Sequence, residues 1–145
     1  MEINFKKVHT AKDLTISTIV LLAGTGLFFV NKGLGVTIAA FGLAMFFLYK
    51  DGYRIEGSGV VLQKKSEDLC KCCKPSIVDY LNGEDVTPQI EKGNEGGSVR
   101  LDVYYNTAEG IAYAQLYSFR NYTYEPETEV IELHFPKADK LISQL

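Results

Sequence analysis

The 145-residue sequence has no tryptophan, only four prolines and only three cysteines. Four prolines without a repeat exclude collagen-like and proline-rich chains, and eight phenylalanines with nine tyrosines argue against intrinsic disorder. The cysteines are odd in number and crowded together, unlike the spaced, even set of a disulfide-stapled secreted domain. This composition fits a chain that folds in a reducing compartment.

The sequence also lacks a large excess of either charge. Fifteen Lys and Arg residues against eighteen Asp and Glu residues give a net charge of −3. No helical segment clusters basic residues, so we do not expect a nucleic-acid partner. No phosphate-binding glycine motif opens a helix either, and the glycine-rich segment 92–97 is predicted to be a loop between strands.

Charge is nearly absent from residues 14–49, where Lys32 is the single charged residue. Two apolar runs of seventeen residues, 14–30 and 33–49, flank a two-residue turn, and neither has the polar face of a soluble helix. At about 1.5 Å per residue each run would be roughly 25 Å long, at the short end of what spans a bilayer. We therefore predict a transmembrane helical hairpin over 14–49, with a soluble helical hairpin or a cleaved signal peptide as alternatives.

Basic residues lie on one side of this predicted hairpin, with three lysines in the preceding segment 1–13 and several more basic residues just after residue 49. This asymmetry predicts a multi-pass protein of the bacterial inner membrane with both termini in the cytoplasm. The runs contain no Asp, Glu, His or Arg, so any pore would have to be oligomeric. The expected partners are a lipid bilayer and further copies of the chain, associated through the hairpin.

Residues 50–145 are predicted to form a small cytoplasmic β-rich domain. Residues 99–105 alternate apolar and polar side chains, and a five-residue turn, 106–110, separates them from a second strand, 111–119. A symmetric turn would pair Val103 with Tyr113 and Val99 with Tyr117. Further strands are predicted at 53–64, 86–91 and 129–135, with a short helix at 75–81 and a capping helix at 136–145. The fold class is thus a helical hairpin followed by an all-β barrel or curved sheet with a C-terminal helix.

An aromatic stripe on the predicted strands suggests a ligand site. Tyrosines stack on planar groups and arginines bind phosphates, so an anionic ligand such as a nucleotide could lie on one sheet face. The candidate residues are Arg100, Tyr104, Tyr113, Tyr117 and Arg120. The alternative is that these side chains simply pack across the strands.

Enzymatic chemistry has little support in the sequence. His134 has no identifiable partner for catalysis, so no catalytic residue and no cofactor are predicted. Cys70 and Cys73 have a CxxC spacing, but a closed zinc site needs four ligands and the sequence offers no second such pair. These two cysteines are weak metal candidates, and a redox role or partial burial in a loop are the alternatives.

In outline, two apolar runs joined by a short turn and followed by a β-rich domain resemble two bacterial architectures. One is the two-transmembrane β-barrel effector of CBASS-type antiphage systems, which would imply cyclic-nucleotide binding and membrane disruption. The other is the PH-like two-pass membrane protein, whose sheet ends in a C-terminal helix. The resemblance is topological and carries no site residue.

We therefore predict a non-enzymatic two-pass inner-membrane protein that forms an oligomer and whose β-rich domain binds a ligand or a protein partner. A membrane-disrupting antiphage effector activated by a cyclic nucleotide is one alternative. An accessory subunit that anchors a larger membrane complex is the other.

Overall fold

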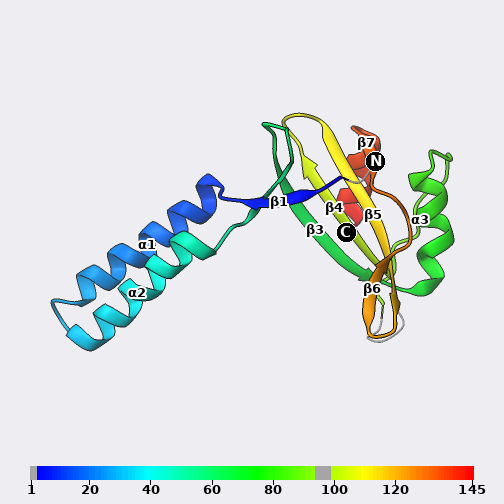
Figure 1. The fold of residues 1–145 in the computed structure, drawn as a ribbon. Coiled ribbons are helices and arrows are strands. Elements are labelled where there is room, and N and C mark those ends of the chain that lie inside the picture. The colour runs from blue at the N-terminus through cyan, green and yellow to red at the C-terminus, as the bar shows by residue number, and fades with distance from the viewer. Residues whose placement is uncertain (1–2, 94–98) are drawn as a thin grey trace. The chain divides into compact units, whose positions relative to one another are not determined.

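The computed structural model describes residues 3–93 and 99–145, so residues 94–97 of the predicted glycine-rich loop lie outside the described residues. The chain divides into two compact units (Figure 1). We call Phe5–Val61 the hairpin unit and Leu62–Leu145, together with residues 3 and 4, the sheet unit. Each unit is described by itself below.

The hairpin unit contains two helices enclosed by two short strands. Its elements are β1 (Phe5–Val8), α1 (Ala11–Leu27), α2 (Lys32–Leu48) and β2 (Gly52–Ile55). The strands pair antiparallel, with Phe5 opposite Ile55, and so join the two open ends of the helical hairpin. The side chain of Thr10 caps the start of α1, and the side chain of Asn31 caps α2.

Glycines set the distance between α1 and α2. A Cβ atom added to Gly24, Gly35 or Gly42 would lie 2.2, 2.3 or 2.6 Å from a backbone nitrogen of the facing segment. No other residue fits at such a separation, because real Cβ contacts are never this short. The small residues of the two runs therefore face each other, and the large apolar side chains point outward.

The structure corrects the prediction of a transmembrane hairpin. Among the described residues, no helix is long and apolar enough to cross a membrane. α1 begins at Ala11 and takes Lys12 and Asp13 into its first turn, and it ends at Leu27 although the apolar run continues to Val30. Its uncharged part is therefore about 21 Å long, and that of α2 about 24 Å, against a hydrocarbon core of about 30 Å.

The same finding contradicts the predictions that depend on membrane crossing. These are the two-pass topology, the placement in a bacterial inner membrane with both termini in the cytoplasm, and the functions stated for a two-pass protein. The contradicted functions include the membrane-disrupting effector and the accessory subunit that anchors a membrane complex. The fold is a helical hairpin with a two-stranded ribbon, followed by an antiparallel sheet and a C-terminal helix.

Over the part of the chain that the structure describes, the sheet unit contains five antiparallel strands and two α-helices. Its strands are β3 (Val61–Leu69), β4 (Val99–Asn106), β5 (Ile111–Arg120), β6 (Thr123–Pro126) and β7 (Ile131–His134). Strand β4 lies between β3 and β5, and β5 pairs with β6 along its second half and with β7 along its first. A 3-10 turn (Lys71–Cys73) leads into α3 (Lys74–Leu81), and α4 spans Lys137–Gln144.

Most predicted elements of the sheet unit are confirmed. The hairpin of β4 and β5 and both predicted helices are present, and the predicted strand 129–135 corresponds to β7. The predicted strand 53–64 is two strands, β2 and the start of β3, separated by a turn in which Gly57 has a φ of 84°. The predicted strand 86–91 is wrong, since this segment forms no strand and only a single bridge pairs Lys92 with Leu69.

Both helices cover one face of this sheet. Apolar side chains of β4 and β5, among them Leu101, Val103 and Leu116, are fully buried there. Ile77 of α3 and Leu141 of α4 belong to the same cluster. Each fully buried aliphatic side chain contributes about 1.5 to 3 kcal/mol. The opposite face of the sheet carries four of the side chains that the sequence singled out, Arg100, Tyr104, Tyr113 and Tyr117.

Candidate functional site

Four of the five predicted ligand-binding residues share one face of the sheet. Arg100 lies opposite Tyr117, and Tyr104 lies opposite Tyr113. Residues directly opposite each other in an antiparallel pair point to the same side, and so do residues two apart on one strand. The structure therefore brings Arg100, Tyr104, Tyr113 and Tyr117 together, on the face away from α3 and α4.

Arg100 is held by other residues of this face. Its guanidinium carbon lies 4.9 Å from the ring centre of Tyr117 and 4.5 Å from that of Tyr124. Its Nε lies 3.1 Å from Oδ1 of Asp102 but makes no hydrogen bond among the described residues, since the alignment is poor. The guanidinium therefore lies close to two tyrosine rings and beside a carboxylate, while its Nε has no hydrogen-bond partner among the described residues.

Asp102 is the centre of a buried polar network on this face. It is 1% exposed, its Oδ2 lies 2.8 Å from Nζ of Lys64, and the Ser66 hydroxyl donates a hydrogen bond to it. Burial alone would lower the pKa of Lys64, but hydrogen bonding and attraction to Asp102 raise it above its ordinary value. Lys64 is therefore engaged with Asp102, and this ion pair links β3 to β4.

Arg120 lies on the other face of the sheet. It follows the buried residues Ala114, Leu116 and Ser118 at alternate positions of β5, and its Nη2 donates to Oε2 of Glu127 at 2.9 Å. The prediction that Arg100 and Arg120 share a face is therefore wrong. A ligand bound to the tyrosine face would not contact both arginines.

The described residues of the sheet unit line a larger and a smaller cavity. The larger, of about 580 Å³, is lined by Gln115 and Tyr117 and by residues that follow β6, including Glu127 and Glu129. The smaller, of about 440 Å³, lies between the loop after α3 and the start of α4. Of the predicted ligand-binding residues only Tyr117 lines either cavity, and the carboxylates of the larger one disfavour an anion. Nucleotide binding stays a prediction.

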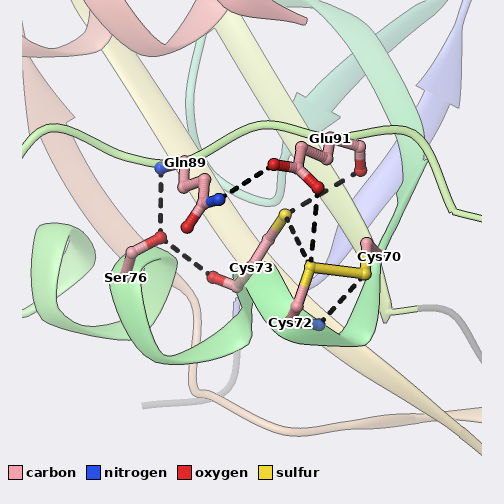
Figure 2. The surroundings of a disulfide bond; sticks show 6 residues. All are labelled: Cys70, Cys72, Cys73, Ser76, Gln89 and Glu91. Atoms are coloured by element: carbon pink, nitrogen blue, oxygen red, sulfur yellow. Dashed lines mark hydrogen bonds between the residues drawn. A yellow bond between two sulfur atoms is a disulfide. The ribbon is translucent and has the colours of Figure 1, made fainter.

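The three cysteines form a cluster with Glu91 at the start of α3 (Figure 2). A disulfide joins Cys70 to Cys72, whose Cα atoms are 5.2 Å apart, while Cys73 is a free and fully buried thiol. The Sγ of Cys72 lies 4.0 Å from that of Cys73 and 3.7 Å from Oε2 of Glu91. The sequence-predicted pair, Cys70 with Cys73, is thus not the bonded pair.

Glu91 is a functional candidate that sequence reasoning missed. It lies 18 residues beyond Cys73 in a segment predicted to be a strand, and no spacing rule connects it to the cysteines. The structure places it there because the backbone N–H of Cys70 donates to the carbonyl oxygen of Glu91 at 2.8 Å. Cys70, Cys72 and Glu91 offer ligand atoms that all lie within 4.8 Å of one another.

The hairpin unit presents the other unusual surface. Fifteen large hydrophobic side chains are exposed among the described residues, and all except Tyr122 lie between Ile16 and Tyr49. Phe29 and Val30, at the turn between the helices, are 85% and 84% exposed. Globular proteins bury such residues in their cores, whereas here small residues fill the helix interface. We call the outward side chains from Ile16 to Tyr49 the apolar hairpin surface.

Comparison with known proteins gives no match: no protein-family model, no curated protein and no solved structure is significantly similar to this chain.

Proposed function

We propose that this protein is an assembly module whose hairpin unit associates with the hairpin units of further copies. The observation that carries this proposal is the apolar hairpin surface, which covers both α1 and α2 and has no charged side chain between Leu14 and Val30 or between Gly33 and Tyr49. A helix that is apolar all round is stable in a protein only when other apolar groups cover it. The sheet unit is the part that the assembly displays.

The size of this surface favours more than one neighbour. At about 200 Å² for a fully exposed large side chain, the exposed fractions from Ile16 to Tyr49 correspond to on the order of 1,500 Å². The largest apolar patch on a typical monomer is about 300 to 600 Å². An ordinary interface covers about 800 Å² on each partner. One neighbour of ordinary size would leave about half of the surface exposed, so three or more copies are expected.

The chemistry of the surface favours a copy of the same chain as the neighbour. A partner has to be apolar over a comparable area, because a charged partner would lose its hydration without gaining a counter-charge. Among the described residues, the only such area is the apolar hairpin surface itself. Identical surfaces that pack on each other generate the closed symmetric assemblies common among soluble oligomers.

The contacts that hold the hairpin together lie within one chain. The glycine contacts hold α1 against α2, and the N–H of Asp51, just after α2, donates to Asp13 of α1 at 2.9 Å. A surface that is already ordered loses less conformational entropy on binding, which favours association. The exposed side chains can therefore be altered without removing the contacts that form the hairpin.

The proposal is tested by measuring the mass of the full chain, with light scattering and native mass spectrometry, in the mildest detergent that keeps it dispersed. The test variant carries Leu22→Glu and Phe41→Glu, at positions that are 65% and 63% exposed. The matched control is Tyr122→Glu, which changes a 95% exposed aromatic residue of the sheet unit. We expect three or more copies for the wild type and the control. The double variant should dissociate, with an apparent dissociation constant at least about a hundredfold higher, because like charges would meet in the interface.

A wild-type particle with a single protein copy and bound detergent would overturn the proposal, because an amphiphile and not a second protein would then cover the hairpin. An unchanged mass of the double variant would overturn it as well. Circular dichroism of the variants shows whether the helices and the sheet are retained, so dissociation is distinguished from unfolding.

A further inference from the structure

The segment from Cys70 to Cys73 brings three cysteines to one point, where β3 ends and α3 begins. The Glu91 side chain reaches the same point from the segment after α3 (Figure 2). Cys72 and Glu91 are exposed and Cys70 is half-buried, so the donor atoms can be reached from solvent. Cys73 is fully buried beneath them in the core cluster.

Backbone contacts hold this arrangement without help from the disulfide. The N–H of Cys70 donates to the carbonyl oxygen of Glu91, and the N–H of Gly93 donates to that of Asp68 at 3.0 Å. The Ser76 hydroxyl of α3 donates to the carbonyl of Cys73 and accepts from the N–H of Gln89. These bonds fix both segments, so the donors stay together when the disulfide is reduced.

The Glu91 carboxylate is itself oriented. Nε2 of Gln89 donates to its Oε1 at 2.9 Å, which leaves Oε2 on the side of the cysteines, 3.7 Å from Sγ of Cys72. An outer hydrogen bond of this kind fixes a ligating carboxylate in many metal sites. In a tetrahedral zinc site, neighbouring ligand atoms are about 3.5 to 3.8 Å apart. The separation between Cys72 and Glu91 already has this value.

We propose that the reduced protein binds a thiophilic divalent cation of the zinc class through Cys70, Cys72 and Glu91, and that the Cys70–Cys72 disulfide closes this site. Two thiolates and a carboxylate suit zinc, and three protein ligands leave a fourth position for water. The three anionic ligands balance the two positive charges of the cation with one negative charge to spare. This inference is independent of hairpin assembly.

Opening the site requires two electrons and two protons. A dithiol reductant supplies both: its sulfurs form a disulfide, and the Cys70–Cys72 bond breaks to give two thiols. The cation then displaces the two thiol protons to solvent as the thiolates bind it. The site thus couples cation binding to the redox state of the surrounding thiol pool.

The test uses the full chain, oxidised or reduced with an excess of dithiol that is then removed under anaerobic conditions. Zn²⁺ affinity is measured by competition with a chromophoric chelator, and Co²⁺ is titrated as a spectroscopic probe, since thiolate ligation gives charge-transfer absorption. We expect one equivalent of cation to bind the reduced protein and none to bind the oxidised protein. Cys72→Ser should weaken binding at least about a hundredfold and Glu91→Gln about tenfold.

Glu125→Gln is the matched control, because it removes an exposed carboxylate of the same unit outside the cluster. It should bind as the wild type does. Equal affinity in the oxidised and reduced proteins would overturn the proposal, and so would unchanged affinity of the Glu91→Gln variant. Cobalt binding without thiolate charge-transfer absorption would also overturn it, because the cation would then lie elsewhere.

Discussion

At the scale of single residues, the helical hairpin depends on where glycine is required and where it is not. Gly24 and Gly26 lie two positions apart on α1, and both are neighbours of Thr25 in the sequence. A Cβ on Gly24 would lie 2.2 Å from the backbone nitrogen of Ala39, whereas a Cβ on Gly26 would meet nothing within 4 Å. Sequence alone shows two equivalent small residues, and only the packing of α2 distinguishes them.

This contrast gives a matched pair of variants. Gly24→Ala should separate the helices and destabilise the hairpin by roughly 1 to 3 kcal/mol, the usual range for overpacking. Gly26→Ala should be neutral or stabilise it by up to about 1 kcal/mol, because alanine is the better helix former. Amide hydrogen exchange of α1 measures the free energy of local opening in both variants. Equal protection in the two variants would show that the helices are not in close contact at Gly24.

At the scale of elements, the sequence predicted several of the strands and the antiparallel hairpin of β4 and β5, but not the register of that hairpin. Alternation over 99–105 and 111–119 correctly predicted β4 and β5. The predicted pairs, Val103 with Tyr113 and Val99 with Tyr117, are wrong by one residue, since Tyr104 lies opposite Tyr113 and Arg100 opposite Tyr117. The turn sets this register: Asn106 pairs with Ile111, and the Asn106 side chain accepts from the N–H of Glu109.

A one-residue shift moves side chains to the other face of a sheet, which is why the predicted ligand site is only partly assembled. It separates Arg120 from Arg100 and leaves the tyrosines on the face opposite the core. Glu91 was missed for a related reason. Its place beside the cysteines follows from a backbone hydrogen bond between segments about twenty residues apart, and no local pattern encodes that contact.

Glu127 shows how one residue can join several elements of the sheet unit. Its carboxylate accepts hydrogen bonds from Lys74 of α3 and from Ser118 and Arg120 of β5. Glu127→Gln should destabilise the sheet unit by about 1 to 2 kcal/mol, because three donors lose a charged acceptor that is only partly shielded from solvent. Urea unfolding followed by tyrosine fluorescence measures the change. Glu125→Gln, at an exposed position nearby, should leave the midpoint unchanged, and an equal shift in both variants would contradict this role of Glu127.

At the scale of the whole molecule, the two units differ in how apolar and polar groups are distributed. The sheet unit buries its large apolar side chains against α3 and α4, whereas the hairpin unit buries glycines and exposes its large apolar side chains. The sequence already showed this division, because residues 14–49 are nearly uncharged while the rest is not. The apolar pattern of the sequence could not show where α1 begins and ends, because apolar content does not determine a helix terminus. The Thr10–Asp13 capping box fixes where α1 begins.

Each unit also holds a carboxylate that makes its stability depend on pH. Burial acts to raise the pKa of Asp13, but hydrogen bonds from the backbone N–H groups of Asp51 and Thr10 and the contact with His9 outweigh it and lower that pKa below 3.8. Hydrogen bonds from Lys74 and then Ser118 lower the pKa of Glu127 below 4.5. The unfolded chain therefore binds protons at a higher pH than the folded chain at both positions. The stabilisation is fully present when the pH is above the ordinary pKa values of these carboxyl groups. It is lost as the pH falls through their lowered pKa values in the folded state.

Thermal unfolding, measured from neutral pH down to about pH 3, should accordingly show that both units lose stability only when the pH falls below the ordinary pKa range of carboxyl groups. The two contributions are separable because they lie in different units. Glu127→Gln should make the stability of the sheet unit, which is followed by its tyrosine signal, less dependent on pH in the acid range. It should leave the pH dependence of the helical signal unchanged. Asp13→Asn should do the opposite, since the amide keeps the size of the side chain but cannot titrate. An acid dependence unaffected by either substitution would mean that other carboxylates control the acid unfolding of both units.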